Sequence, residues 1–169
     1  MDAEQFRRSV EALASRVYSH AAYLLRDREE ARDVVQETFV RMWRHCDRID
    51  GEPAARAWAL KTAHNLAFDR LRARVNGTPV DLDLAAEIAS SELSAEGSLA
   101  RRELRRQIDG ALAGMSPADR AILLLREVQG LSYNELAHVA GLPLGTLKAL
   151  LHRARARLRR RLIAAGIRP

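Results

Sequence analysis

Cysteine is nearly absent from this chain, and no cluster of metal-ligating residues takes its place. Cys46 is the single cysteine among 169 residues, which makes an internal disulfide impossible. The five histidines are scattered; His45 and Cys46 are adjacent, and adjacent residues on a helix point in different directions. The sequence therefore predicts no disulfide framework and no metal or cofactor site.

Long apolar runs are also missing. A run such as Ala121 to Leu125 holds five residues, whereas roughly 20 are needed to span a bilayer. The N-terminal segment mixes charges with apolar side chains and lacks the continuous apolar stretch of a secretory signal. We expect a protein with no membrane span that stays in the cytoplasm.

Glycine and proline are sparse, at 9 and 5 residues. Apolar residues recur at three- and four-residue spacing, which is the pattern of amphipathic helices, and strands have almost no support. We therefore predict an all-α fold. The expected helices cover residues 3–25, 28–46, 54–75, 97–113, 117–129, 133–140 and 144–164.

Local signals support three of the expected helix starts. Asp27 with Glu30, and Ser132 with Glu135, have the capping-box spacing, in which the first side chain accepts a bond from a helix amide and the second reaches back. Pro117 stands where a first helical turn is expected, and its missing N–H costs nothing there.

Charge is distributed unevenly along the chain. Residues 1–76 carry a net charge of +2, residues 77–100 carry −5 with no basic group, and residues 101–169 carry +9. The middle segment also contains glycine, proline and a serine cluster, which is typical of an exposed linker. We therefore predict two small helical domains, 1–76 and 101–169, joined by a flexible acidic linker at 77–100.

The segment from Leu131 to Leu158 has the pattern of a short capped helix, a tight turn and a longer basic helix. Ala137 is small where two helices must approach closely. Gly141 follows four residues later, where the turn needs a positive φ, and Leu147 is expected on the buried side of the second helix. This spacing is the signature of a helix-turn-helix in the C-terminal domain.

The outward face of the second helix is basic. Residues 145–169 hold eight basic residues and no acidic one, as expected of a surface that neutralises phosphates. The N-terminal part of such a helix normally enters the major groove, whereas its later arginines are better placed to contact phosphate. A basic helix without a DNA role is the alternative. The candidates for DNA contact are Thr146, Lys148, Ala149, Leu150, Arg153, Arg155 and Arg157.

The stretch AILLLREVQGLSYNELAHVAGLPLGTLKALLHRARARL, residues 121–158, resembles the promoter-binding C-terminal domain of the extracytoplasmic-function (ECF) group of bacterial sigma-70-type sigma factors. Gly-Leu-Ser-Tyr, Glu-Leu-Ala, Gly-Thr-Leu-Lys and His-Arg-Ala-Arg carry the match. The resemblance implies that the second helix reads the minus thirty-five promoter element.

Two outward positions depart from the family pattern. Ala149 and Leu150 stand where the family usually has Ser and Arg, which removes a hydroxyl and a guanidinium from the reading face. We expect either an altered promoter preference, through contact with a thymine methyl group, or weaker upstream binding.

In the N-terminal half, residues 27–46 have the pattern of an amphipathic helix. Its expected inner stripe is Ala31, Val34, Val35, Thr38, Phe39, Met42 and Trp43. Spacing alone favours a solvated surface for the remaining polar residues. However, Asp-Val-Val-Gln-Glu-Thr-Phe-Val-Arg-Met-Trp resembles the ECF segment that docks on the clamp helices of the polymerase β′ subunit. The resemblance implies polymerase contacts for Asp33, Gln36, Glu37 and Arg41.

The next segment is expected to form a turn at Asp50-Gly51 and Pro53 and then a long helix that ends in basic residues. The resemblance implies that it captures the non-template strand of the minus ten element, where a basic groove with planar or amide groups can engage flipped bases. Leu60 replaces a common Tyr of the family, and Trp58 is expected to be core rather than a stacking platform. The candidate strand contacts are Lys61, His64, which replaces a common Arg, Asn65 and Arg70.

The resemblance covers roughly residues 5–163. It implies a sigma factor that binds RNA polymerase core, at the β′ clamp helices and the β flap, and promoter DNA. An anti-sigma factor is a further expected partner. A stand-alone helix-turn-helix regulator and a sequestering mimic of a sigma factor are the alternatives. No nucleophile and base pair, phosphate-cradling glycine loop or carboxylate cluster indicates an enzyme.

Overall fold

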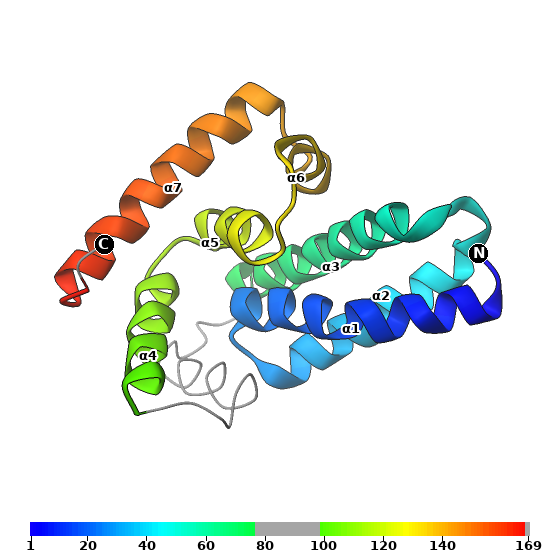
Figure 1. Cartoon of the computed structure of the whole chain (residues 1–169), viewed down its shortest axis with the longest axis horizontal. Helices are drawn as coiled ribbons and strands as arrows, with labels where there is room; N and C mark the ends of the chain where they lie inside the picture. The colour runs from blue at the N-terminus through cyan, green and yellow to red at the C-terminus, as the bar shows by residue number, and fades with distance from the viewer. Residues whose placement is uncertain (77–98, 168–169) are drawn as a thin grey trace.

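The computed structural model describes residues 1–76 and 99–167, and every regular element in this range is helical, which confirms the predicted all-α fold. The predicted linker lies outside the described residues, apart from its last two, which begin a helix. The elements, labelled as in Figure 1, are α1 (Ala3–Leu25), α2 (Arg28–Arg44), the 3-10 turn η1 (Cys46–Arg48), α3 (Gly51–Asn76), α4 (Leu99–Ala113), α5 (Pro117–Leu123), the π-helical turn η2 (Leu124–Val128), α6 (Tyr133–Ala140) and α7 (Leu144–Ala164).

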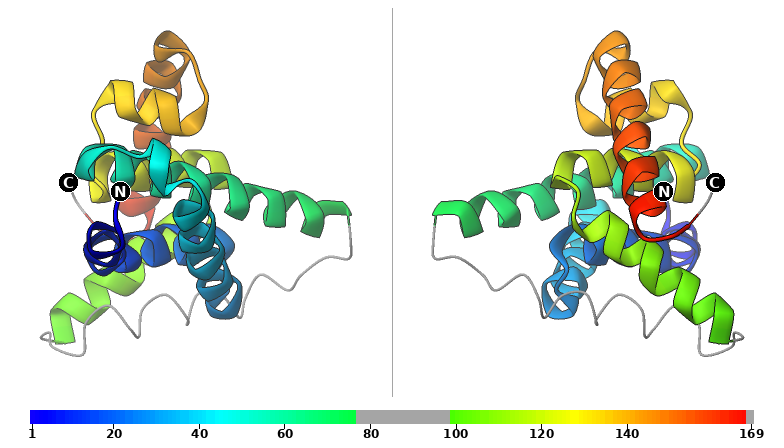
Figure 2. Two further views of the ribbon diagram at one scale, coloured as in Figure 1. Left: turned by 90° about the vertical axis from the view of Figure 1, so that its right-hand side faces the viewer. Right: turned by 90° about the vertical axis from the view of Figure 1, so that its left-hand side faces the viewer.

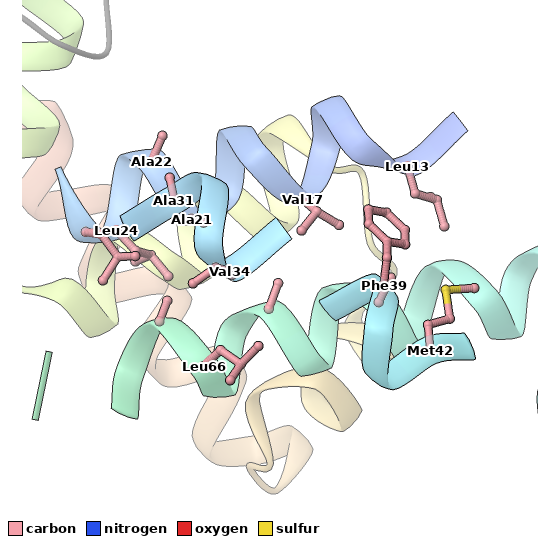
Figure 3. Packing of buried hydrophobic residues seen from close by; sticks show 14 of the residues in the cluster. Leu13, Val17, Ala21, Ala22, Leu24, Ala31, Val34, Phe39, Met42 and Leu66 are labelled. Atoms are coloured by element: carbon pink, nitrogen blue, oxygen red, sulfur yellow. The ribbon is translucent and has the colours of Figure 1, made fainter. Parts of the chain in front are cut away.

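Helices α1, α2 and α3 pack together as a three-helix bundle (Figure 1). Each helix contributes apolar side chains at helical spacing to one shared core, and Figure 3 shows Val17 of α1, Val34 of α2 and Leu66 of α3 gathered there. Val17 and Val34 are fully buried. The bundle therefore holds the outer face of α2 and the basic helix α3 in fixed positions.

Two details of this bundle differ from the sequence-based expectation. Helix α3 begins at Gly51, so the expected turn residue Pro53 already lies in the first helical turn, where proline is tolerated. Trp43 was expected in the inner stripe of α2, but it is 48% exposed and stacks edge-on against Phe6 of α1 at 4.9 Å between ring centroids. Periodicity locates the centre of a buried stripe better than its edge, and Trp43 lies at the edge.

The cap of α2 is only half of the expected capping box. Asp27 accepts from the Glu30 backbone N–H at 2.9 Å, as predicted. The Glu30 carboxylate lies instead 2.8 Å from the guanidinium of Arg74 on α3, a partly buried ion pair. A contact between helices thus replaces the local one and ties α2 to α3.

Helices α6 and α7 form the predicted helix-turn-helix. Ser132 and Glu135 make the complete capping box at the start of α6. Gly141 ends α6 in the left-handed conformation, with φ +66°, which L side chains rarely adopt. Leu136 of α6 and Leu147 and Leu151 of α7 are buried in one cluster, which fixes the face that α7 turns outward.

The helix-turn-helix is not separate from the N-terminal bundle. Helix α6 contacts α3, and α5 contacts α1, so that the C-terminal helices stack on the bundle (Figures 1 and 2). Leu60 of α3 is fully buried in the hydrophobic cluster of the C-terminal helices. Among the helices of the described residues, none combines the length and apolar character that crossing a membrane requires.

Candidate nucleic-acid and partner interfaces

The N-terminal half of α7 presents polar side chains on the face opposite its core. Thr146, Lys148 and Arg153 are exposed, whereas Leu147 and Leu151 are buried between them. The Lys148 ammonium lies 5.9 Å from the centre of the Tyr133 ring. This alternation gives a cationic strip that a groove of DNA can meet without unpacking the helix.

The candidate arginines of α7 fall into two groups. Arg153 makes no ion pair within the described residues. Arg155 pairs with the exposed Glu127 at 2.6 Å, and Arg157 pairs with Asp119, whose carboxylate side chain is only 6% exposed. Arg157 therefore neutralises a buried charge of its own domain.

The two positions that depart from the family pattern differ in exposure. Ala149 is exposed on α7. Leu150 was expected to point outward, but it is half-buried and packs against the cluster around Leu147 and Leu151. An apolar side chain at the edge of the helix face gains more by covering this core than by remaining in water. Of these two positions, Ala149 is therefore the more exposed one.

The outer face of α2 carries the residues that the resemblance assigns to polymerase docking. Asp33, Gln36 and Arg41 are exposed, Glu37 is half-buried, and Arg41 donates to Glu37 at 2.6 Å. Val40 lies on the same face and is 39% exposed. Val40 was not among the predicted contacts, although its position four residues after Gln36 places it on this face.

The candidate strand contacts of α3 are less accessible than the sequence suggested. Asn65 is exposed, but the Lys61 ammonium lies 3.4 Å from Nε2 of His138 on α6. Arg70 donates to the Glu30 carbonyl oxygen at 3.1 Å and lies 3.9 Å from the Asp33 carboxylate. Only Asn65 therefore faces solvent without such a contact among the described residues.

His64 is enclosed between two other rings. Its ring centroid lies 4.6 Å from that of Phe68 and 5.7 Å from that of the fully buried His20. Burial lowers the pKa of His64 to about 4, and burial together with His64 lowers the pKa of His20 to about 3. Both imidazoles are therefore neutral near pH 7, and His64 offers no positive charge to a phosphate.

Comparison with known proteins identifies the family of the chain. The family model for sigma-70 region 2 matches residues 9–76, and that for sigma-70 region 4 matches residues 105–158. The ECF RNA polymerase sigma factor SigW of Bacillus subtilis is 27% identical over 170 residues, which cover 95% of this chain and 90% of that protein. The ECF RNA polymerase sigma-E factor of Salmonella typhimurium is 35% identical over 131 residues, covering 73% and 69% of the two chains.

A solved structure has the same fold. The sigma factor RpoE of Bartonella quintana, in complex with the anti-sigma factor NepR, superposes with a TM-score of 0.75 at 23% identity and covers 94% of this chain and 97% of its own. The chain therefore belongs to the ECF group of sigma-70-type RNA polymerase sigma factors. It is an initiation factor that binds RNA polymerase and directs it to specific promoters, and the alternative of a stand-alone regulator is not favoured.

Proposed function

We propose that three surfaces divide the work of initiation. The outer face of α2 docks on the β′ clamp helices, α3 holds the non-template strand of the minus ten element, and the N-terminal half of α7 reads the minus thirty-five element. Residues 1–76 thus form the docking and strand-capture domain, and residues 101–169 the upstream-binding domain, with a further contact to the β flap. The observation that carries this assignment is the exposed strip formed by the hydroxyl of Thr146 and the cations of Lys148 and Arg153, opposite the buried Leu147 and Leu151.

The docking assignment rests on the mixed character of the α2 face. Asp33, Gln36, Glu37 and Arg41 supply polar groups of both signs, which favour one partner and one orientation over others. Val40 supplies an exposed apolar side chain in their midst, and an apolar group at the centre of a polar face is a common feature of protein interfaces.

The four candidate residues of α3 have different roles in the proposed strand capture. Asn65 and Lys61 are the residues that we propose to touch the strand, since an amide can bond a base edge and an ammonium can neutralise a phosphate. His64 supports the helix as a neutral, enclosed ring. Arg70 fixes α3 to α2 through the Glu30 carbonyl, and this bond leaves part of its guanidinium for DNA.

The upstream assignment implies an unusual promoter preference. Ala149 presents a methyl group where the family usually has a hydroxyl, and a methyl group packs against the C5-methyl of thymine. Selection of binding sites by holoenzyme carrying Leu150→Arg should yield a different sequence preference from wild type. Identical preferences would show that position 150 takes no part in reading.

The experiment that tests the whole assignment is transcription in vitro with purified core polymerase on fragmented DNA from the source organism. Specific starts should appear only when the chain is added. Glu37→Lys should reduce core binding at least about 10-fold, because it reverses a charge in the docking face. Glu11→Lys is the matched control, since Glu11 is an exposed glutamate in a similar ion pair with Arg7 on α1.

Lys148→Ala should separate binding to core polymerase from recognition of the minus thirty-five element. The variant should bind core polymerase normally and lose starts at promoters that depend on the minus thirty-five element. Loss of core binding by Lys148→Ala, or normal core binding by Glu37→Lys, would overturn the assignment of surfaces.

We also infer the setting in which the chain acts. Its polymerase partner places it in the cytoplasm, and the chain supplies specificity while polymerase supplies catalysis, so that we expect no enzymatic activity of its own. RpoE of Bartonella quintana is bound by an anti-sigma factor. We propose a partner of the same kind here, which affinity purification of the tagged chain from its source organism would identify by mass spectrometry.

A further inference from the structure

The C-terminal end of α7 lies beside α4, and an open cavity is found where these two helices meet the start of α5 (Figures 1 and 2). The cavity has a volume of about 620 Å³. We call it the Gly114 pocket. The lining residues that decide its chemistry are Gly114, Ser116, Asp119, Arg157, Arg160 and Arg161.

Positive charge dominates the Gly114 pocket. Arg157, Arg160 and Arg161 line it, and Asp119 is the one acid among the described residues that do so, which gives a net charge of +2. The Asp119 side chain is nearly buried and forms an ion pair with Arg157, so these two charges cancel. The guanidiniums of Arg160 and Arg161 therefore set the electrostatic character of the pocket.

Arg160 and Arg161 have no protein partner for their charge. Their side chains make neither an ion pair nor a hydrogen bond within residues 1–76 and 99–167, whereas Arg155 and Arg157 of the same helix both pair with carboxylates. A guanidinium carries five N–H donors in a planar fork whose geometry matches the oxygens of a phosphate. The pocket thus holds two unused groups of this kind.

Gly114 allows one of these guanidiniums to enter the pocket wall. A Cβ at position 114 would lie 2.0 Å from Nη1 of Arg161 and 2.6 Å from its Cζ. The backbone angles of Gly114 are not in the left-handed region, so the turn itself does not require glycine. The missing side chain therefore serves the close approach of Arg161 to the backbone.

Ser116 adds a neutral donor beside the two cations. Its hydroxyl oxygen accepts from the Asp119 backbone N–H at 3.2 Å, as a helix cap. A hydroxyl can accept one bond and donate another, and the Ser116 hydroxyl donates to no acceptor within the described residues. Its proton is therefore available to a ligand in the pocket.

The Gly114 pocket is separate from the strip of α7 that is assigned to promoter reading. That strip ends at Arg153, and Arg160 follows seven residues later. At about 1.5 Å of rise per residue, the two side chains start roughly 10 Å apart along the helix axis. The pocket therefore needs a ligand of its own, or a part of DNA that lies beyond the reading strip.

We propose that the Gly114 pocket binds a phosphate group, which is held by the guanidiniums of Arg160 and Arg161 and by the hydroxyl of Ser116. Two unpaired cations match a phosphate monoester, which carries a charge of about −1.5 to −2 near pH 7 and three acceptor oxygens. A carboxylate carries one charge and two oxygens, so it would leave one guanidinium unpaired. The site goes beyond the proposed function, since it lies outside the three surfaces assigned to initiation.

Titration calorimetry of the chain with inorganic pyrophosphate tests the site. Arg160→Gln and Arg161→Gln should each weaken pyrophosphate binding about 10-fold, because each removes a charged hydrogen-bond donor. Gly114→Ala should weaken it about 5-fold, because the added methyl group displaces the Arg161 guanidinium. Acetate, as the carboxylate probe, should bind at least about 10-fold more weakly than pyrophosphate.

Two matched controls carry the same chemical changes outside the pocket. Arg159→Gln removes an exposed arginine of α7 that does not line the pocket. Gly110→Ala adds a methyl group to α4 at a position where it meets no atom within 4 Å. Both controls should bind pyrophosphate within about 2-fold of wild type, because exposed charges at a distance are screened by salt. Thermal unfolding followed by circular dichroism checks that every variant is folded.

The phosphate can belong to a small molecule or to DNA upstream of the minus thirty-five element, and a second measurement separates these sources. Holoenzyme binding is compared on a promoter duplex that ends at this element and on one that is longer by one helical turn, about 10 base pairs. A DNA source predicts that Arg161→Gln lowers the salt slope by about 0.9 on the longer duplex alone. A small-molecule source predicts unchanged slopes on both duplexes.

The outcomes decide the proposal without reference to transcription. Weaker pyrophosphate binding by Arg161→Gln and Gly114→Ala but not by the controls would establish the site, and a changed salt slope on the longer duplex alone would assign its phosphate to DNA. Equal pyrophosphate binding by wild type, Arg161→Gln and Arg159→Gln, with unchanged slopes on both duplexes, would overturn the site. Acetate binding as tight as that of pyrophosphate would overturn its preference for phosphate.

Discussion

The arginines of α7 should separate into structural and DNA-binding residues when each is replaced by alanine. Arg157→Ala leaves the Asp119 carboxylate, of which 6% is exposed, without its cation. Breaking a buried ion pair costs about 3–5 kcal/mol, but the Arg157 side chain is 49% exposed, so that water reaches the carboxylate once it is removed. We therefore expect the free energy of unfolding to fall by about 1–2 kcal/mol.

Arg153→Ala should have the opposite profile. Arg153 is exposed and makes no ion pair within the described residues, so its removal should change the unfolding free energy by less than about 0.5 kcal/mol. It removes one cation from the DNA surface. For promoter binding by holoenzyme, the slope of log affinity against log salt should become shallower by about 0.9. Raising the salt from about 50 to 200 mM should therefore weaken the variant roughly 3-fold less than it weakens wild type.

Urea unfolding followed by circular dichroism measures the first effect, and promoter binding by holoenzyme at several salt concentrations measures the second. Each variant serves as the control for the other. Equal unfolding free energies for Arg157→Ala and Arg153→Ala would refute the conclusion that Arg157 is held by the fold, and an unchanged salt slope for Arg153→Ala would refute its contact with DNA.

Three more predictions follow from local geometry. Since His20 and His64 keep pKa values of about 3 and 4 in the folded chain, against 6.5 when unfolded, the unfolded chain binds more protons below pH 6.5 and stability falls with acidification. The loss at about pH 5.5 should be roughly 1.4 kcal/mol per histidine, and His20→Phe should halve the slope of unfolding free energy against pH. Gly141→Ala should destabilise by about 1 kcal/mol through its φ of +66° alone, because an added Cβ meets no atom within 4 Å. Gly145→Ala, equally open but helical, should be neutral or stabilising in the same thermal unfolding assay. Leu150→Arg should lower stability slightly by uncovering the cluster beneath it, and a rise in the unfolding midpoint would contradict its half-buried position.

Much of the fold was predictable because its signals are local. The spacing of apolar residues gave the bounds of α1, α6 and α7 without error, and the Ser132 capping box and the glycine at position 141 marked both ends of α6. These features depend on hydrogen bonds and backbone angles within a few residues, which the sequence encodes directly. The family resemblance added an expected partner for each surface, and comparison with known proteins confirmed the family.

The sequence by itself determined the helices, the helix-turn-helix and the face that α7 presents, because each follows from periodicity and from short-range capping. Only the tertiary structure decided which candidate side chains are free. Arg157 forms an ion pair with Asp119. The Glu30 carboxylate pairs with Arg74 and does not complete the capping box of its own helix. Leu60 is buried among the C-terminal helices. The partners in these contacts lie far apart in the chain. The periodicity of one helix predicts which of its faces is buried, but it does not predict which distant residue will contact that face.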